Sequence, residues 1–429
     1  MLSRSKKSAV VLMVGALLLT AGCAGKAGTQ GGAPASDGAS AEGVPAGASK
    51  EDFIAAFADI EPITLTTQAV EAKGAREAQY YLDFVESLSE WSGGKLTMEI
   101  AYGNSIASPS DIPQALADGR VNMERAYPLY DPSRYPANAA FAESAFLGNQ
   151  SPVAGSLQTF AAYLEVGLSM SDVLQPEFAE QGMVALLPYA PQTAPGILCR
   201  EPHANGGGWE GTQIRVSGSA HADQVRALGM SPISLSYAEV YPAIERGTID
   251  CLVGADWSFR TTGVLPLAPN YVLDSDAGFT KTTTAVAFSK STWDELPLVA
   301  RQLIWDRLDV WIGHFFGDHI LETMAASQEE ILAAGAEVTQ FDDASRKSLL
   351  AANKTLLEKV ENSEVIDGQK LVSDLEAALA KWEKIVVDEL GYTEAVGEDF
   401  ITAVRSDDFD IQPFMERLKQ EILLPNRPE

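Results

Sequence analysis

Three residues at one turn carry groups suited to contact a small molecule: the backbone of Gly254, the carboxylate of Asp256 and the indole of Trp257. They follow the short run TIDCLVG (248–254), whose β-branched and apolar residues predict a strand. In open α/β sheets, ligands bind beyond the carboxyl ends of the strands. We therefore expect this turn to face a cleft and to contact a ligand there.

The residues before the turn supply the elements that would position it. Residues 232–235 predict a short extended segment, and SYAEVYPAIERG (236–247) has the serine start, apolar stripe and glycine stop of a helix. The order strand, helix, strand is the repeating unit of an α/β sheet. The local pattern thus places the turn at a sheet edge.

The histidines and serines show no catalytic or metal-binding spacing. His314 and His319 lie five residues apart, so on a helix they would not share a face as an i,i+4 pair does. The sequence contains no Gly-x-Ser-x-Gly elbow, no Gly-x-x-x-x-Gly-Lys-[Ser/Thr] loop and no dinucleotide fingerprint. We expect no enzyme activity, no metal site and no cofactor.

Residues 1–22 predict a bacterial signal peptide. A basic start precedes an apolar core over residues 9–19, which is too short to span a membrane. The ending LTAGC resembles a lipobox, in which Cys23 is lipidated, although Thr20 stands where leucine is usual. An ordinary cleavage site is the alternative. We expect Cys23 to carry a lipid anchor and the rest of the chain not to span the membrane.

Residues 24–50 consist almost entirely of Gly, Ala, Ser and Pro. Such a segment buries too little apolar surface to offset its ordering entropy, so we predict a flexible tether over 23–60, with the folded part starting near Glu51 or Glu61. About 370 residues remain, which is enough for two lobes.

The chain is strongly acidic, with 31 basic and 59 acidic residues and a formal net charge of −28. Removal of the signal peptide would take away three basic residues and no acidic one. This charge argues against nucleic acid and against a broad contact with anionic membranes. It does not define the ligand, because one buried arginine can outweigh a solvated acidic surface locally.

Besides Cys23, the sequence contains Cys199 and Cys251. In an exported protein an isolated pair suggests a disulfide, whereas two separate buried thiols would give the same count. We expect these two cysteines to be bonded to each other, with Cys251 at the end of its strand.

The rest of the chain alternates between strand and helix patterns. Strands are predicted over 63–70, 95–102, 120–127, 183–189, 196–200, 212–216, 282–290 and 336–341, with helices over 75–91, 108–119, 220–229 and 291–335, and again after 341. Units of this kind predict a mostly parallel sheet with right-handed crossovers.

The stretch EGTQIRVSGSAHADQVRALGMSPISLSYAEVYPAIERGTIDC (210–251) resembles the dicarboxylate-binding (DctP-type) solute-binding proteins of tripartite ATP-independent periplasmic (TRAP) transporters. Weaker similarity extends from SDIPQALADGRVNM through LPLAPNYVL to STWDELPLVARQLI. The resemblance implies an α/β fold of the two-lobed periplasmic-binding-protein type (type II), with long bracing helices.

On this basis lobe I would span residues 61–195, with about 272–330 returning to it, and lobe II would span 196–271. Residues 331–429 would form a late strand and the C-terminal bracing helices. The disulfide would then fix lobe II near its hinge.

The resemblance also implies roles for individual residues. The arginine of the Ile-Arg-Val strand, here Arg215, would bind the ligand carboxylate through its planar fork, the alternative being a structural ion pair. The aromatic residue before the Glu-Val-Tyr helix, here Tyr237, would pack on the ligand or else in the lobe core. Glu239 and Tyr241 are expected to cap and pack the helix.

Two departures from the family pattern bear on the ligand. Sialic-acid-binding members carry an asparagine where this chain has Gly254, and their earlier arginine aligns near Ala194. Sialic acid is therefore not expected. Asp256 and Trp257 stand where other members present ligand contacts.

Together these observations predict an extracytoplasmic, lipid-anchored receptor that binds a small organic acid and delivers it to the small four-helix and large multi-span TRAP membrane subunits. A receptor that presents its ligand to a sensor kinase remains open from the sequence, as does an exported lipoprotein enzyme. The carboxylate itself is not defined: dicarboxylates, 2-oxo acids, aromatic acids and sugar acids all fit.

Overall fold

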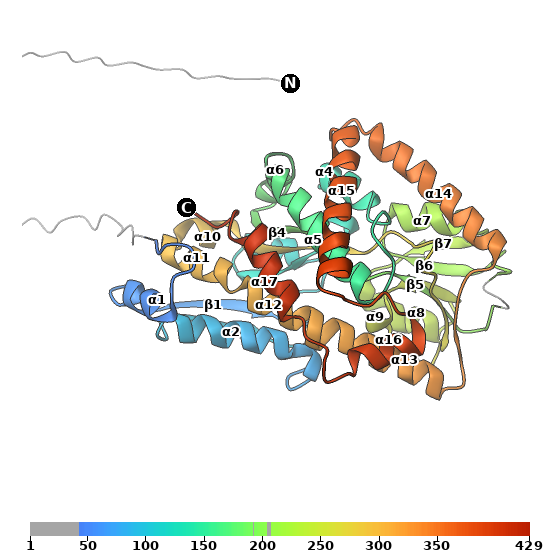
Figure 1. Cartoon of the computed structure of the whole chain (residues 1–429), viewed down its shortest axis with the longest axis horizontal. Coiled ribbons are helices and arrows are strands. Elements are labelled where there is room, and N and C mark those ends of the chain that lie inside the picture. The colour runs from blue at the N-terminus through green and yellow to red at the C-terminus, as the bar shows by residue number, and fades with distance from the viewer. Residues whose placement is uncertain (1–42, 192, 204–206) are drawn as a thin grey trace, which may run out of the picture. The chain divides into compact units, whose positions relative to one another are not determined.

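The chain forms two β-sheets surrounded by helices in this computed structural model, which describes residues 43–191, 193–203 and 207–429 (Figure 1). The predicted signal peptide and Cys23 lie outside the described residues, as does most of the predicted tether.

The first sheet has the strand order β2-β1-β3-β10-β4. Its strands are β1 (Ile63–Gln68), β2 (Leu96–Ala101), β3 (Met123–Ala126), β4 (Met183–Pro191) and β10 (Thr283–Ser289). β1 pairs in parallel with β2 and β3, whereas β10 runs antiparallel to β3 and β4. The parallel part of this sheet brings the carboxyl ends of β1 and β3 to the same edge.

The second sheet has the strand order β11-β9-β5-β8-β6-β7. Its strands are β5 (Gly196–Cys199), β6 (Gln213–Val216), β7 (Ser231–Ser234), β8 (Cys251–Gly254), β9 (Asn270–Val272) and β11 (Val338–Thr339). β6 pairs in parallel with β7 and β8, and β5 runs antiparallel to β8 and β9. The carboxyl ends of β6 and β8 therefore also share one edge.

Both sheets are mostly parallel, as predicted, and each contains one reversed strand: β10 in the first sheet and β5 in the second run antiparallel to both of their neighbours. The chain leaves the first sheet after β4 and returns to it at β10, and both strands pair antiparallel with each other. β5 is the first strand after the chain leaves the first sheet, and β9 is the last strand before it returns. These two strands also pair antiparallel. The strand pattern of the sequence indicates where strands lie and leaves their direction within a sheet open.

The helices cover both sheets. In chain order they are α1 (Lys50–Phe57), α2 (Gln79–Trp91), α3 (Ile112–Ala117), α4 (Pro136–Glu143), α5 (Ala154–Ser169), α6 (Ser171–Glu180), α7 (Ser219–Ala227), α8 (Val240–Glu245), α9 (Asp256–Thr261), α10 (Lys290–Glu295), α11 (Leu298–Asp306), α12 (Leu308–His314), α13 (Glu322–Ala333), α14 (Asp343–Glu361), α15 (Gly368–Glu383), α16 (Gly397–Val404) and α17 (Gln412–Leu418). Shorter 3₁₀ turns are η1 (Arg76–Ala78), η2 (Pro128–Tyr130) and η4 (Tyr237–Glu239), and π-helical segments are η5 (Phe315–Leu321), η6 (Lys384–Glu389) and η7 (Lys419–Leu423).

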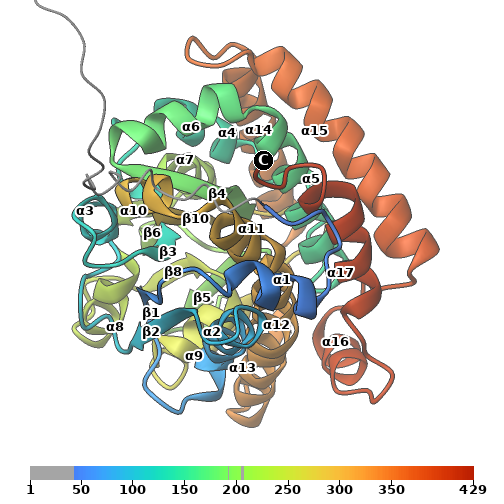
Figure 2. The same ribbon diagram turned by 90° about the vertical axis from the view of Figure 1, so that its left-hand side faces the viewer.

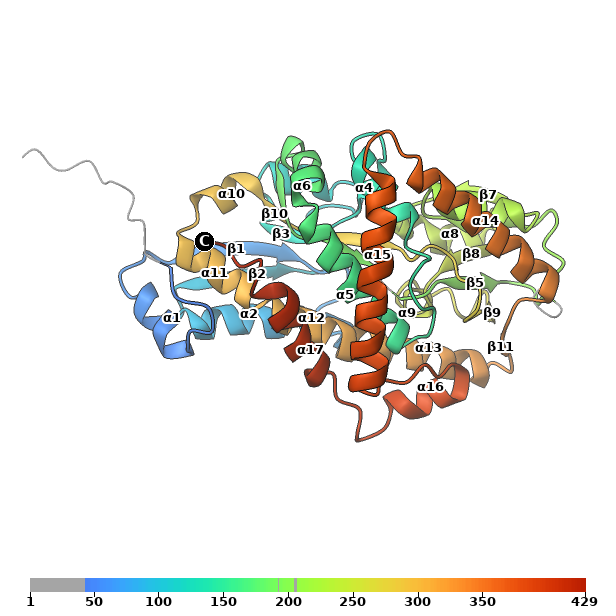
Figure 3. The same cartoon turned by 45° about the horizontal axis from the view of Figure 1, so that its top comes forward.

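Long helices of the C-terminal third connect the two sheets. In Figure 3 the strands of the first sheet lie to the left of α15 and those of the second sheet to its right. α15 packs on α5 (Figure 2), and α14 packs on α4 and α7. One ion pair joins two of these helices: Lys359 Nζ of α14 lies 2.7 Å from Glu143 Oε1 of α4.

The folded part begins at the earlier of the two predicted points, near Glu51, so the tether is shorter than the predicted range of 23–60. Ser49 caps α1 through a capping box with Asp52, and Phe53 and Phe57 of this helix are fully buried. Phe53 contacts the Trp91 ring edge-on, with 5.8 Å between ring centroids. The two phenylalanines supply the apolar surface that the Gly- and Ala-rich segment before them lacks, so residues 50–57 belong to the fold.

The described helices are either too short or too polar to cross a bilayer.

Candidate functional site

A cavity lies where the carboxyl ends of strands from both sheets meet. Its walls come from the ends of β1 and β3 in the first sheet and of β6 and β8 in the second, together with the start of α9. The lining residues are Val70, Glu71, Arg125, Tyr127, Tyr130, Arg215, Ser217, Tyr237, Gly254, Ala255, Trp257, Ser258, Thr261 and Thr282. This position agrees with the expectation that the turn after β8 faces a cleft.

Arg215 projects from β6 into this cavity and is held by backbone. Its Nε donates to the carbonyl oxygen of Leu235 at 3.0 Å, and its Nη1 donates to that of Val253 at 3.3 Å. The residue is 5% exposed, and no aspartate or glutamate among the described residues lies within ion-pair distance of it. Burial lowers the pKa of its guanidinium, which an arginine nevertheless keeps protonated. The guanidinium is thus a buried positive charge that is oriented before any ligand arrives.

A second arginine enters the cavity from the first sheet. Arg125 lies on β3, is 3% exposed, and its Nε is 3.8 Å from the carboxylate of the adjacent Glu124. Glu124 itself accepts hydrogen bonds from the Tyr81 hydroxyl at 2.9 Å and from the Arg125 backbone at 2.8 Å. Burial raises the pKa of Glu124 to about 7, against the attraction of Arg125.

Glu71 supplies an acidic group to the same cavity. It follows β1, and its side chain is 7% exposed. Burial raises the pKa of its carboxyl, while the positive charge of Arg125 opposes that shift. Its Oε1 lies 3.9 Å from Nε2 of His319, whose pKa burial lowers to about 3, so the imidazole beside it is neutral.

Aromatic rings form the remaining walls. Tyr127 and Tyr130 stack with 5.1 Å between ring centroids and 12° between ring planes. Tyr237 stacks on Trp257 at 6.4 Å, and its hydroxyl donates to the Ser258 carbonyl oxygen at 3.2 Å. These rings offer flat apolar surface in the cavity that also contains the two arginines.

The residues that cap η4 take the expected places. Ser236 and Glu239 form a capping box, in which the Ser236 backbone donates to Glu239 Oε2 at 2.9 Å. Glu239 and Tyr241 do not line the cavity. The cap fixes the start of the segment that carries Tyr237.

Gly254 lines the cavity at the end of β8. A Cβ added to this residue would lie 2.9 Å from the Phe259 ring and 3.2 Å from Ser258 Oγ. The glycine therefore permits the close approach of α9 to β8, and a side chain here would displace α9.

Asp256 does not line the cavity, contrary to the expectation that it contacts the ligand. Residues 256–261 form α9 where a turn was predicted, and this turns the Asp256 carboxylate toward α13, where Oδ2 accepts a 2.6 Å hydrogen bond from Gln328 Nε2. The side chain is fully buried, and burial raises its pKa to about 7. Trp257, the next residue, does line the cavity.

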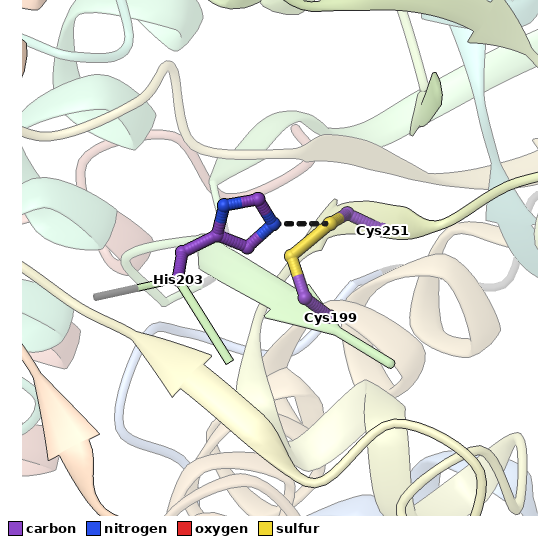
Figure 4. A group of neighbouring side chains, drawn as sticks. All are labelled: Cys199, His203 and Cys251. Carbon is purple, nitrogen blue, oxygen red and sulfur yellow. Dashed lines mark hydrogen bonds between the residues drawn. A yellow bond between two sulfur atoms is a disulfide. The ribbon is translucent and has the colours of Figure 1, made fainter. Parts of the chain in front are cut away.

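Cys199 and Cys251 form the predicted disulfide, which joins β5 to β8 (Figure 4). Cys251 begins β8, although the sequence pattern predicts it at the end of a strand. His203 lies beside the bond, with Nε2 3.9 Å from the Cys251 sulfur. Because both sulfurs are in the disulfide, this group offers no thiolate to a metal ion.

His314 and His319 have separate surroundings, as their spacing predicts. His314 Nδ1 lies 2.6 Å from Asp318 and 3.2 Å from Asp83, and the bond to Asp318 raises the pKa of the imidazole. His319 packs against the Trp257 indole, with 5.4 Å between ring centroids.

The structure thus brings Arg215, Tyr237, Gly254 and Trp257 to one cavity and leaves Asp256 outside it. Sequence reasoning missed Glu71, Arg125 and the two stacked tyrosines. The rule applied to β8, that ligands lie at the carboxyl ends of strands, would have indicated them at the ends of β1 and β3.

The family model of the bacterial extracellular solute-binding proteins, family 7 (DctP), matches residues 68–364. The ectoine-binding periplasmic protein TeaA of Halomonas elongata is 23% identical over 263 residues, which cover 61% of this chain and 72% of TeaA.

Solved structures of TRAP solute-binding proteins share the fold. A protein of Rhodoferax ferrireducens in complex with copurified benzoate has a TM-score of 0.64 at 19% identity, covering 76% of this chain and 100% of that one. A marine-metagenome protein specific for pyroglutamate has a TM-score of 0.62 at 17% identity, covering 74% and 100%. The predicted two-lobed α/β fold is confirmed.

Proposed function

The chain belongs to family 7 of the bacterial extracellular solute-binding proteins, and we propose that it captures a small organic acid in the cavity between its two sheets. The observation that carries this proposal is the buried guanidinium of Arg215, which two backbone carbonyl oxygens orient toward the cavity. A guanidinium fork binds both oxygens of a carboxylate, and burial strengthens the pair.

The walls support a ligand with a flat or apolar body. Four aromatic side chains line the cavity: Tyr127, Tyr130, Tyr237 and Trp257. The names of similar proteins agree with a carboxylate class, since they bind ectoine, pyroglutamate or benzoate. The ligand bridges residues of both sheets, so its binding favours the closed arrangement of the lobes.

A thermal-shift screen of organic acids tests this function. Benzoate, pyroglutamate and ectoine are added to the purified chain with a neutral sugar and a simple amine as controls. A ligand present at about 100 times its dissociation constant adds about 2.7 kcal/mol of stability, which raises the melting temperature measurably. A shift from the sugar or the amine together with none from any acid would overturn the proposal.

We further propose that the loaded protein delivers its solute to the TRAP membrane subunits and is held at the membrane by a lipid on Cys23. The sequence supports the anchor through the lipobox-like ending LTAGC and the Gly- and Ala-rich segment that follows Cys23. Fractionation of cells that express the full chain tests it: the wild type should sediment with membranes and Cys23→Ser should not. Equal membrane association of both would contradict the anchor.

A further inference from the structure

A second group of side chains suited to a ligand lies outside the solute cavity. Asp83 of α2, His314 at the end of α12 and Asp318 of η5 each present one donor atom, and these three atoms lie within 4.8 Å of one another. These residues are not among those that line the cavity of Arg215. The cluster combines one imidazole nitrogen with two carboxylate oxygens, and zinc accepts both kinds of ligand.

His314 faces both carboxylates with the same ring nitrogen. Its Nδ1 lies 3.2 Å from Oδ2 of Asp83 and 2.6 Å from Oδ2 of Asp318. Nδ1 carries at most one proton, so a protonated imidazole offers one donor to two carboxylates and cancels one of their two charges. A divalent cation bound to the neutral imidazole contacts both carboxylates and cancels both charges. The cluster therefore matches a dication better than a proton.

The distances in the cluster are close to those of a zinc site. With bonds of about 2.0–2.2 Å and tetrahedral angles, the ligand atoms of zinc lie roughly 3.3–3.6 Å apart. The 3.2 Å between His314 and Asp83 is already near this range. Asp318 would move away from the imidazole by about 1 Å or less to reach it. Its side chain is 47% exposed, so it has room for this movement.

Other residues orient the cluster and give water access to it. Gln79, one turn earlier on α2, donates from Nε2 to Oδ1 of Asp83 at 2.9 Å, while Oδ2 of Asp83 faces His314. Groups that orient a ligand from behind in this way are typical of metal sites. His314 and Asp318 also line a surface cavity beside residues 404–412. Water in this cavity can fill the coordination position that three protein ligands leave open.

A neighbouring cation, Arg76 of η1, also attracts Asp318. Its ion pair is with Glu322, at 3.5 Å, and its side chain is 63% exposed. An exposed arginine of this kind contributes little through its ion pair and can turn toward solvent when a metal ion binds.

We propose that Asp83, His314 and Asp318 bind a divalent transition-metal cation of the zinc type, with water as the fourth ligand. The imidazole selects Zn²⁺ over Mg²⁺ and Ca²⁺, which prefer sites made of oxygen ligands alone. The ion would join α2 to α12 and η5, which already pack against α2, and so stabilise the fold without contacting the solute. Histidine spacing did not indicate this site, because one ligand comes from a helix far earlier in the chain.

Calorimetric titration of Zn²⁺ into the metal-free chain 24–429, without an affinity tag, tests the site. The wild type should bind about one Zn²⁺ per chain, and its melting temperature should rise on binding. His314→Gln and Asp83→Asn should each weaken Zn²⁺ binding by at least about tenfold, because even the groups behind metal ligands contribute tenfold to a hundredfold. Both side chains are partly exposed, so both variants should fold, which circular dichroism checks. Mg²⁺ should bind much more weakly than Zn²⁺.

Two variants outside the cluster serve as controls. Asp408→Asn removes the same charge as Asp83→Asn from an exposed position, and His203→Gln removes a histidine that lies beside the disulfide. Both should bind Zn²⁺ as the wild type does. Three results would overturn the inference: no Zn²⁺ binding by the wild type, wild-type affinity in folded His314→Gln or Asp83→Asn, or an equal loss in the two controls. Binding of Mg²⁺ as tight as that of Zn²⁺ would overturn it as well.

Discussion

The carboxylate of Asp256 accepts a 2.6 Å hydrogen bond from the side-chain amide of Gln328, a residue of α13 that lies 72 positions later in the chain. The bond ties α9, at the edge of the cavity, to the long helical segment behind it. Gln328 Oε1 is buried and has no hydrogen-bond partner among the described residues. An ionised carboxylate has no proton to donate to this oxygen, whereas a protonated Asp256 carboxyl has one. The pair is thus suited to a neutral Asp256, in keeping with the pKa of about 7 that burial gives this group.

Asp256→Asn should therefore stabilise the protein at high pH. The folded pKa lies above the ordinary value of 3.8, so this group's contribution to stability is full below pH 3.8 and is lost as the pH rises through 7. Asparagine stays neutral, so at pH 8 the variant should be more stable by on the order of 2–4 kcal/mol, and at pH 4 equal to wild type.

Urea denaturation at both pH values measures this difference, with exposed Asp407→Asn as the control. A variant that is no more stable than wild type at pH 8 would contradict a raised pKa. The solute affinity of Asp256→Asn should stay within about twofold of wild type, because Asp256 does not line the cavity and so does not contact the ligand. A large loss of affinity would return Asp256 to the binding site.

Removal of the disulfide should destabilise the second sheet without abolishing the cavity. The bond spans 52 residues, and the chain-entropy model gives about 4 kcal/mol for a loop of that length. Urea denaturation of a Cys199→Ala, Cys251→Ala double variant, in a chain that starts at residue 24, measures this loss. Two free thiols in the unfolded, unreduced parent chain would show that the bond does not form.

Phe53→Ala should cost the fold on the order of 3–5 kcal/mol, because it removes a fully buried ring at the N-terminal helix. Ile54→Ala is the matched control on the same helix: this side chain is 39% exposed, and its truncation should cost less than about 1 kcal/mol. Equal losses for the two variants would mean that α1 does not pack on the core in solution.

Local pattern and family resemblance located one half of the candidate site. The residues 210–257 run through consecutive strand and helix signals, so Arg215, Tyr237 and Trp257 could be placed at strand ends in advance. The cap formed by Ser236 and Glu239 could also be predicted from the sequence, because a capping box is defined by two residues that lie three positions apart.

The other half depends on contacts that are distant in sequence. Glu71 and Arg125 reach the cavity only because β1 and β3 pair in parallel and because the ends of both strands face the second sheet. No local pattern specifies that meeting. Asp256 was misplaced for the same reason, since its partner Gln328 lies on a helix whose position the sequence alone does not give.

The central claim is that Arg215 holds the carboxylate of the solute. Arg215→Lys keeps the charge but loses the two parallel hydrogen bonds, and Arg215→Ala loses both. Because the guanidinium also binds the carbonyl oxygens of Leu235 and Val253, some loss of stability is expected, and circular dichroism with a thermal melt must show that each variant is folded.

Calorimetric titration of these two variants with the acid that most raises the wild-type melting temperature is the most direct test. The predicted result for Arg215→Ala is a loss of about 2–5 kcal/mol of binding free energy, or roughly 30- to several-thousand-fold in affinity, and Arg215→Lys should also bind clearly less tightly than wild type. Near-wild-type affinity in a well-folded Arg215→Ala variant would contradict the claim and remove Arg215 from the binding site.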